Sequence, residues 1–519
     1  MKFAGFLSAL LLVGSVSAQM QKASGRHAVF ARANTPQNAE DMAKEYDPEK
    51  ACKPYSPNEI TQLLKDKRFP KPNKIATIVD GDEEAQKVWK EIQQSNVIPK
   101  NVKVKPSADK SHDEVDGNTD KYNDDKDPDC WWTASQCKKP KHQNIPEDIY
   151  ECPEPDTWGL TFDDGPNCTH NVFYDFLKEK KLKATLFYIG SYVMNLPYQA
   201  QRGLADGHDI CGHTWSHHAM STLTDEQVFA ELYYTGRILK AVLNISTTCW
   251  RPPFGDVDDR VRAIANALGY RTIVWKQDTD DWELSDKSKK NMVQKNYKKI
   301  FNKADKESPI VLTHELYNST MSTFMENYDD LSKAYKNVVP ITACQNVTSP
   351  YLEGDIMYPT FDELTSGKAQ YKGLPSLKDM KINTDVQYKP VPFSQKKVGF
   401  APGAKQPEDN DNNKDNGNGT SEGGKSDNGD GASSSEKHSA SHDKQNSNND
   451  DGNGTSEGGK SNNGSDSSSS QKDNTSQDKN NSDNNDKKGD SGAISLSGAS
   501  MFHVYYATLF TIVATVVFL

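Results

Sequence analysis

Short apolar runs alternate with longer helical patterns between residues 150 and 344, and this alternation restricts the fold more than any other feature of the sequence. The apolar runs cover 157–162, 184–189, 271–275 and 310–313. The helical patterns cover 170–180, 224–243, 257–268, 287–301 and 322–335. Strands that alternate with helices of this length are typical of βα units around a parallel sheet. We therefore predict an α/β fold of the (β/α) barrel type for residues 150–345.

Five polar motifs occur in order along this domain, and each is expected to follow a strand. They are TFDDGP at 161–166, HTWSH at 213–217, RPPFG at 251–255, DTDDW at 278–282 and VLTHE at 311–315. Any one of them can arise by chance, whereas the ordered set within one domain is hard to obtain otherwise. Functional side chains of a (β/α) barrel gather at the carboxyl ends of its strands. The motifs are therefore expected to meet at one end of a barrel.

The first two motifs contain the side chains of a divalent-metal site. Asp163 and Asp164 are adjacent, so one carboxylate can bind a metal while the other faces a substrate. His213 and His217 are four residues apart, which would place both imidazoles on one face of a helical turn. Together with one carboxylate they supply the three protein ligands of a catalytic site with a position left for water. Alone, each pattern fits a solvated turn or a surface histidine pair equally well, and His218 is an alternative ligand.

The other motifs hold candidates for proton transfer. A bound metal makes water more acidic and polarises a carbonyl, and Asp163 is placed to take the proton. His314 suits a general acid because imidazole titrates near neutral pH, although a structural histidine is the alternative. Arg251 can fork onto the Asp163 carboxylate, and Asp281 can orient His314 and raise its basicity. Trp282 offers a flat face for a sugar ring or an acetyl group, unless it is a core residue.

The ordered motifs resemble those of the polysaccharide deacetylase (NodB-homology) family over residues 150–345. The resemblance implies a distorted (β/α) barrel that uses a divalent cation, Co²⁺ or Zn²⁺, to hydrolyse N-acetyl groups. It assigns the base to Asp163 and the catalytic acid to His314. The metal ligands implied by it are Asp164, His213 and His217.

The same resemblance assigns three further residues. Arg251 matches the residue that holds the base, and Phe254 matches the aromatic residue whose backbone N–H helps to bind the oxyanion. Leu312 matches the apolar wall against the acetyl methyl group. The sequence departs from the pattern at Asp280, which leaves open whether Asp280 or Asp281 tunes His314.

The ends of the chain resemble those of fungal chitin deacetylases. Residues 1–18 have the charged, apolar and small-residue pattern of a secretory signal peptide. Residues 401–490 contain no Trp, Tyr, Ile, Leu or Val, which predicts a disordered, glycosylated stalk. Residues 491–519 begin with Ser-Gly-Ala and end in an apolar tail, the pattern of a GPI signal with Ser491 as the attachment site. A plain transmembrane helix is the alternative for that tail.

These features predict a cell-surface protein held at the plasma membrane and cell wall by a GPI lipid. Residues 19–149 and 346–400 are interpreted as accessory extensions of the catalytic domain. The expected reaction removes acetyl groups from the N-acetylglucosamine residues of chitin and gives chitosan and acetate. A deacetylase of another polysaccharide, or a non-catalytic wall mannoprotein or chitin-binding antigen, is the alternative. A glycosidase fits less well because it uses two carboxylates, and the net charge of −11 argues against a nucleic-acid partner.

The cysteines and sequons fit an exported glycoprotein. All eight cysteines precede the stalk, and an even number in a secreted chain predicts disulfides. We expect Cys152 to pair with Cys344 because the two residues flank the entry to and the exit from the barrel. The candidate glycosylation sites are Asn167, Asn244, Asn318, Asn346, Asn418 and Asn453.

Overall fold

The computed structural model describes residues 36–404 except for 110, 113–114, 117–121, 124, 393–394, 396–398 and 403. These residues belong to one compact unit, Met1–Lys414. The expected signal peptide, the stalk beyond residue 404 and the GPI signal lie outside the described residues, as do Ser491, Asn418 and Asn453. Within the described part of the chain, every helix is too short or too polar to cross a membrane.

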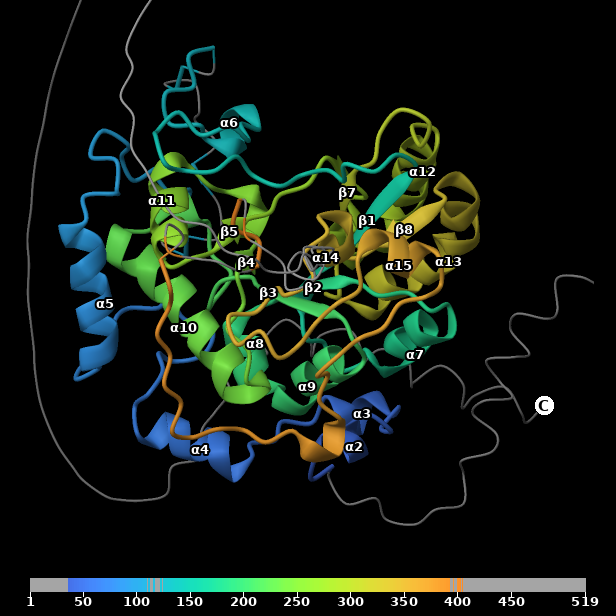
Figure 1. Cartoon of the computed structure of the whole chain (residues 1–519), viewed down its shortest axis with the longest axis horizontal. Coiled ribbons are helices and arrows are strands. Elements are labelled where there is room, and N and C mark those ends of the chain that lie inside the picture. The colour runs from blue at the N-terminus through green and yellow to red at the C-terminus, as the bar shows by residue number, and fades with distance from the viewer. Residues whose placement is uncertain are drawn as a thin grey trace, which may run out of the picture. The chain divides into compact units, whose positions relative to one another are not determined.

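A parallel β-sheet forms the centre of the fold (Figure 1). Its strands are β1 Thr157–Gly165, β2 Thr185–Tyr188, β3 Asp209–Gly212, β4 Cys249–Trp250, β5 Arg271–Thr272, β6 Gln277–Asp278, β7 Ile310–Leu312 and β8 Asn337–Val339. The order is β5-β4-β3-β2-β1-β7-β6, and β8 also pairs with β1. The strands β1, β2 and β3 are buried along their whole length, as expected for a parallel sheet covered on both faces.

The sheet has to curl because its two end strands are neighbours in the chain. Only residues 273–276 separate β5 from β6, and a chain of that length spans at most about 18 Å. A flat row of seven strands would be about 29 Å wide. The strands therefore close into the distorted (β/α) barrel that the sequence predicts, with 273–276 as the closing segment.

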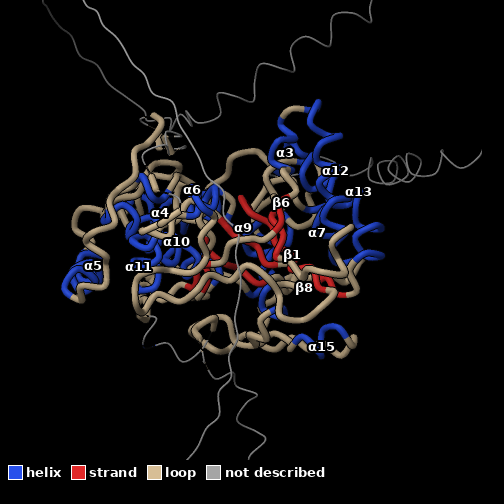
Figure 2. Tube along the Cα trace, turned by 90° about the horizontal axis from the view of Figure 1, so that it is seen from above, coloured by secondary structure: helices blue, strands red, loops and turns tan. Residues whose placement is uncertain are grey.

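Helices surround the strands, as Figure 2 shows. In the barrel domain they are α7 Asn171–Glu179, α8 Gly190–Asn195, α9 Pro197–Ala205, α10 Asp225–Leu243, α11 Asp259–Ala267, α12 Lys290–Phe301, α13 Asn318–Ala334 and α14 Ile341–Cys344, followed by α15 Phe361–Thr365. The long helix α10 begins at a capping box formed by Thr224 and Gln227 and ends at Asn244, whose backbone is left-handed. In Figure 1, α10 and α11 lie on one side of the strands, and α12 and α13 lie on the other.

The N-terminal extension packs directly on the barrel. It contains α2 Ala39–Met42, α3 Pro48–Ala51, α4 Asn58–Lys65, α5 Glu83–Gln94 and α6 Trp132–Ser135. Helix α2 contacts α9, and α5 contacts α10. The buried side chains of Phe69, Ala76 and Trp89 belong to the same apolar core as the barrel residues. The extension is therefore continuous with the barrel core in its packing.

All eight cysteines form disulfides. Cys152 is bonded to Cys344, the pair expected from the sequence. The other bonds are Cys52–Cys168, Cys130–Cys137 and Cys211–Cys249. The bond between Cys52 and Cys168 joins the extension to the loop after β1, and that between Cys211 and Cys249 joins β3 to β4.

Candidate active site

An irregularity in β1 directs two neighbouring carboxylates to the same end of the barrel. Asp163 is paired with Phe187 of β2 and Gly165 with Tyr188, which leaves Asp164 as an extra residue in the ladder. The backbone of Asp164 has a φ of +69°, in the left-handed region. Alternation along a regular strand would send adjacent side chains to opposite faces, whereas a bulge redirects one of them. The bulge thus accounts for two successive carboxylates at the same end of the barrel.

Arg251 follows β4 and holds Asp163 by a single hydrogen bond. Its Nη1 donates to Asp163 Oδ1 at 2.7 Å and to Thr161 Oγ1 at 2.9 Å. Its Nη2 donates to the carbonyl oxygen of Val274 at 3.3 Å, and the guanidinium lies 4.1 Å from the centre of the Phe187 ring. The expected two-pronged contact with the carboxylate is therefore wrong, because the second amino group is bound to the closing segment. Asp163 Oδ2 instead faces the histidine motif.

Asp164, His213 and His217 meet as a cluster of potential metal ligands, with one ligand atom from each residue within 4.8 Å of the others. Asp164 Oδ1 lies 3.1 Å from His217 Nε2 and 3.4 Å from His213 Nε2. His213 Nδ1 bonds the carbonyl oxygen of Arg251 at 2.8 Å. A carbonyl can only accept, so Nδ1 carries the proton of this bond, and Nε2 is the ring nitrogen that faces Asp164. This backing of an imidazole by a carbonyl is a common feature of metal-binding histidines.

The donor set fits a divalent cation. Asp164 Oδ1 is buried without a hydrogen-bond donor of normal geometry. Burial opposes the charge on Asp164, but His217 and His213 outweigh it and hold the pKa of the carboxyl well below its usual range. Burial likewise opposes a charge on His217, whose pKa is nevertheless raised by Asp164. One carboxylate and two imidazoles around a buried centre are the ligands of an open catalytic site, in which a cation would supply the positive charge.

The histidine motif is a curled loop, so the expected helical turn is wrong. Residues 213–217 follow β3 without forming a helix, and the backbones of Thr214 and His217 have φ values of +61° and +59°. Left-handed residues cannot continue a right-handed helix. The loop still brings the two imidazole rings to 4.9 Å between centroids. Two histidines four residues apart can therefore lie side by side in this loop as well as on a helical turn.

His314 follows β7 and is fixed by Asp281. The His314 backbone N donates to Asp281 Oδ2 at 3.0 Å, and His314 Nδ1 lies 2.5 Å from Oδ1. Burial disfavours the imidazolium, but Asp281 outweighs burial and raises the pKa of His314 to about 10. Asp280 instead accepts a hydrogen bond from Asn296 Nδ2 at 2.6 Å. Asp281 is therefore the neighbour of His314 in that motif, which resolves the choice that the sequence leaves open.

Two large aromatic side chains stay exposed beside these charged groups. Phe254 is 51% exposed, its backbone has a φ of +58°, and its ring lies 4.7 Å from that of His217. Trp282 follows Asp281 directly and is 47% exposed. Exposed aromatic faces next to polar groups are suited to a sugar ring. Leu312 lies within β7 and is almost fully buried.

Glu315 is a functional neighbour to which the sequence assigned no role. It is fully buried and accepts hydrogen bonds from the Asn167 backbone N at 2.8 Å and from the Tyr174 hydroxyl at 2.7 Å. His170 Nδ1 lies 2.8 Å from the same carboxylate. Glu315 thus ties the turn after Asp164 to the end of β7, next to His314. In the sequence, a glutamate placed just after the buried apolar run 310–313 could have indicated this role.

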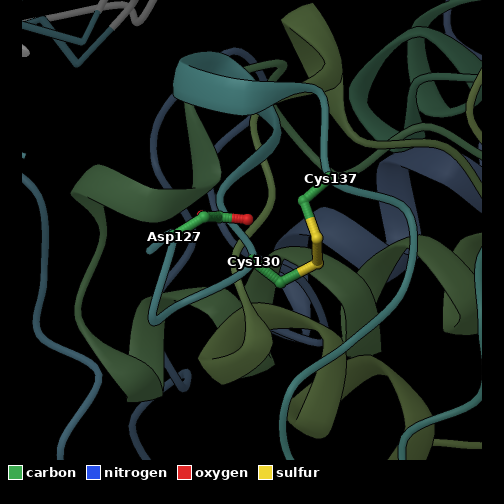
Figure 3. A group of neighbouring side chains, drawn as sticks. All are labelled: Asp127, Cys130 and Cys137. Carbon is green, nitrogen blue, oxygen red and sulfur yellow. A yellow bond between two sulfur atoms is a disulfide. The ribbon is translucent and has the colours of Figure 1, made fainter. Parts of the chain in front are cut away.

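A second group of metal-type side chains, Asp127, Cys130 and Cys137, also lies within 4.8 Å (Figure 3). Its two cysteines are bonded to each other, so neither offers a thiolate. Asp127 Oδ1 accepts from the Tyr122 hydroxyl at 2.6 Å and from the Trp131 backbone N at 2.9 Å. This group is a structural staple and does not fit a metal.

The four described sequons differ in their surroundings. Asn244, Asn318 and Asn346 are exposed. Asn167 is half-buried, and its Nδ2 donates to the carbonyl oxygen of Leu316 at 2.9 Å. Three of the candidate sites are thus open to a glycan in the folded protein.

Comparison with known proteins identifies the family. Residues 150–273 match the family described as polysaccharide deacetylase. Chitin deacetylase 2 of Cryptococcus neoformans var. grubii is 42% identical over 336 residues, which cover 63% of this chain and 72% of the relative. The chain belongs to the polysaccharide deacetylase family.

Two other chitin deacetylases are also similar to this chain. Chitin deacetylase of Amylomyces rouxii is 41% identical over 322 residues, which cover 60% of this chain and 74% of the relative. The solved structure of the chitin deacetylase from Colletotrichum lindemuthianum is 25% identical, with a TM-score of 0.35, and covers 38% of this chain and 90% of that one. The curated relatives thus extend the likeness beyond residues 150–273, since each aligns over more than 300 residues.

Proposed function

We propose that this protein hydrolyses the N-acetyl groups of N-acetylglucosamine residues in chitin and gives chitosan and acetate. The observation that carries the proposal is the Asp164–His213–His217 cluster, beside which Asp163 and the Asp281-bound His314 lie paired on neighbouring strands. Its membership of a family whose similar relatives are chitin deacetylases supports chitin as the substrate.

A divalent cation held by Asp164, His213 and His217, which we propose to be Co²⁺ or Zn²⁺, would polarise the acetyl carbonyl and make the attacking water more acidic. Asp163 accepts the proton of that water. Its Oδ1 is bound by Arg251, whereas its Oδ2 faces the cluster at 3.8 Å from His213 Nε2. Oδ2 is therefore the oxygen that receives the proton.

His314 acts on the other side of the amide. The water oxygen bonds to the carbonyl carbon, the carbon–nitrogen bond then breaks, and the leaving amine takes a proton from His314. Asp281 occupies Nδ1, so the proton comes from Nε2. The amine remains on the sugar and acetate is released, which balances the reaction as a hydrolysis.

The remaining predicted residues would bind the substrate. The backbone N–H of Phe254 would donate to the oxyanion, and Leu312 would contact the acetyl methyl group. Trp282 would stack on a sugar ring, for which its exposed face is suited. These contacts would place the N-acetyl group over the cluster and leave the polymer along the surface.

We propose that the catalytic domain at 150–345 carries this reaction outside the cell, between accessory extensions at 19–149 and 346–400. Cleavage after residue 18 and GPI attachment at Ser491 would leave the protein at the plasma membrane and cell wall. A stalk of 401–490 that behaved as a flexible coil would give a reach of roughly 50 Å. Phosphatidylinositol-specific phospholipase C should release the activity from membranes. An intact 502–519 segment in the mature protein would instead indicate a transmembrane anchor.

The proposed reaction is tested by acetate release from chitin oligomers with the purified secreted protein. We expect acetate to appear, to disappear after removal of metal by a chelator, and to return when Zn²⁺ or Co²⁺ is added. Parallel assays with other acetylated polysaccharides define the substrate class. No acetate from any of them would favour the non-catalytic wall protein, and undiminished release in a metal-free preparation would refute the mechanism.

A further inference from the structure

A buried carboxylate on the long helix α10 is surrounded by hydrogen-bond donors from the histidine loop. Glu231 is fully buried. Its Oε2 accepts from the backbone N of Trp215 and of Ser216, both at 2.8 Å. Its Oε1 accepts from the Ser216 hydroxyl at 2.6 Å. Two successive backbone N–H groups thus point at one oxygen, a geometry that a helix or a strand does not provide.

These donors lie between the two proposed metal ligands. Trp215 and Ser216 are the central residues of the loop that begins at His213 and ends at His217. The left-handed backbones of Thr214 and His217 turn the chain around the carboxylate. Buried N–H groups need acceptors, and in this loop Glu231 supplies them in place of a helical carbonyl.

The fourth donor to Glu231 comes from the N-terminal extension. The backbone N of Ala76 donates to Glu231 Oε1 at 2.7 Å. The Trp215 indole N–H in turn donates to the carbonyl oxygen of Lys71 at 3.1 Å. The ring of Phe69 stacks on that of Trp215 at 5.8 Å between centroids, with 7° between the ring planes. The extension therefore contacts both the carboxylate and the loop that the carboxylate holds.

Ser191 is a further link between the loop and the N-terminal extension. Ser191, in α8, donates from its hydroxyl and its backbone N to the carbonyl oxygen of Trp215, at 2.5 and 2.9 Å. The same hydroxyl accepts from the backbone N of Asn73 at 2.9 Å. The backbone N, the backbone O and the indole of Trp215 are all engaged, so this residue has little freedom to move.

We infer that Glu231 is a positioning residue for the metal-binding loop and that residues 69–76 of the N-terminal extension complete its support. The inference rests on the proposed metal site and gives the extension, which sequence analysis left without chemistry, a function in that site. Glu231 acts through Trp215 and Ser216 and touches neither the cation nor the substrate. Partners that orient ligands typically change metal affinity by about 10- to 100-fold when they are lost.

The first experiment replaces Glu231 by glutamine in the full-length secreted protein. Four donor groups point at Glu231, two at each carboxylate oxygen. A glutamine keeps the shape of the side chain, but its NH₂ group cannot accept a hydrogen bond. Glu231→Gln therefore loses the bonds to one of the two oxygens. Zn²⁺ affinity is measured by competition with a chromogenic chelator, and unfolding is measured in the same samples without metal. We expect Zn²⁺ to bind about 10- to 100-fold more weakly, and kcat to return toward the wild-type value when Zn²⁺ is saturating.

The matched control is Asp148→Asn, which alters another fully buried carboxylate. Asp148 bonds the guanidinium of Arg262, with Nη2 at 2.7 Å, and makes no contact with the histidine loop. This variant should lose stability while its Zn²⁺ affinity stays at the wild-type value. Equal loss of Zn²⁺ affinity in both variants would reduce the effect of Glu231 to general destabilisation and overturn the inference.

A second pair of variants tests the extension without touching the loop. Phe69→Leu removes the ring stacked on Trp215, whereas Trp89→Leu removes a ring that packs on Phe229, at 5.1 Å between centroids. Both shorten a buried aromatic side chain of the extension. We expect weaker Zn²⁺ binding only for Phe69→Leu, and this pair decides the question if Glu231→Gln does not fold.

The outcomes separate this inference from the proposed function. If the wild-type protein bound no Zn²⁺ and released no acetate, the proposed site itself would be wrong. If the wild type bound Zn²⁺ and released acetate, but Glu231→Gln and Phe69→Leu bound Zn²⁺ as tightly as the wild type, only the positioning role would fall.

Discussion

Two groups of described residues bring three metal-type side chains within 4.8 Å, yet only one of them is suited to a metal. In the cluster of Asp164, His213 and His217, Nδ1 of His213 is bound to a backbone carbonyl, so Nε2 is the nitrogen turned toward Asp164. In the group of Asp127, Cys130 and Cys137, the two sulfur atoms are bonded to each other. What distinguishes the groups is therefore what the rest of each side chain is bound to, and not which residue types meet.

The supports around the two groups differ in the same sense. The carbonyl oxygens of Cys130 and Cys137 accept hydrogen bonds from Arg262 at 2.6 and 2.8 Å, so that disulfide fastens a loop onto α11. Around the Asp164–His213–His217 cluster, the Arg251 carbonyl instead holds the His213 ring, and Glu231 holds the backbone between the two histidines. The bonds around the disulfide close a loop, whereas the bonds around the cluster hold the side chains that could bind a metal.

The largest effect is expected for His217→Ala, which removes one side chain from the Asp164–His213–His217 cluster. We expect loss of bound metal and a fall of acetate release to the assay background. The control is His142→Ala, because His142 bonds Asp259 at 2.9 Å and lies outside the cluster. Metal content by plasma emission spectroscopy, measured with acetate release, checks both variants. A His217→Ala protein that kept its metal and its rate would remove this residue from the site.

Asp163→Asn should separate chemistry from metal binding. The variant keeps the shape of the side chain but removes the base, so kcat should fall by about 10²- to 10⁴-fold with the metal content unchanged. Single-turnover acetate release and metal analysis of the same preparation measure the two effects. Loss of metal with a near-normal rate after resupply would mean that Asp163 and Asp164 have exchanged roles.

Asp281→Asn should have a smaller effect that depends on pH. Asp281 outweighs burial and raises the pKa of His314 to about 10, so its removal lowers that pKa. The acid must be protonated, and activity is therefore lost as the pH rises through the pKa of His314. The alkaline limb of the kcat profile should move to lower pH in the variant. An unchanged limb would show that another group controls it.

The double variant Cys130→Ser, Cys137→Ser should leave the metal content and kcat near the wild-type values. It should cost stability, because the bond closes a loop between cysteines 7 residues apart, which the chain-entropy model values at about 2.5 kcal/mol. Removal of the bond between Cys152 and Cys344, 192 residues apart, should cost about 5 kcal/mol in the same model. Denaturant unfolding measures both. A loss of metal in the first variant would return that group to the list of candidate metal sites.

The sequence predicted the elements whose apolar residues form a recognisable run, and in one of these runs, 271–275, only Arg271–Thr272 forms a strand. The strands at β1 and β2 and the helices α10 and α12 lie where their apolar periodicity placed them. Strands β4 and β6 have two residues each and carry no periodic signal. Their positions depend on pairing with neighbouring strands that are distant in sequence, so a local sequence pattern cannot predict them.

The candidate site shows the same limit. The motif order was enough to expect Asp163, the histidine pair and His314 together, because the strand ends of a barrel meet. The shape of the 213–217 loop was mispredicted because its curl depends on Glu231, a residue of α10 that is distant in sequence. The single bond from Arg251 to Asp163 likewise depends on the carbonyl of Val274, which the motif does not include.

The bond between Cys52 and Cys168 has a consequence for how the protein matures. Cys168 is the middle residue of the sequon at Asn167, and its partner leaves the ribosome 116 residues earlier. Once the bond forms and the turn folds, the Asn167 amide is held by the carbonyl of Leu316 and no longer presents itself to a glycosyltransferase. If the chain is exported and glycosylated as proposed, oxidation and sugar transfer would compete for this short segment. The fraction of molecules that carry a glycan at Asn167 would record which reaction came first.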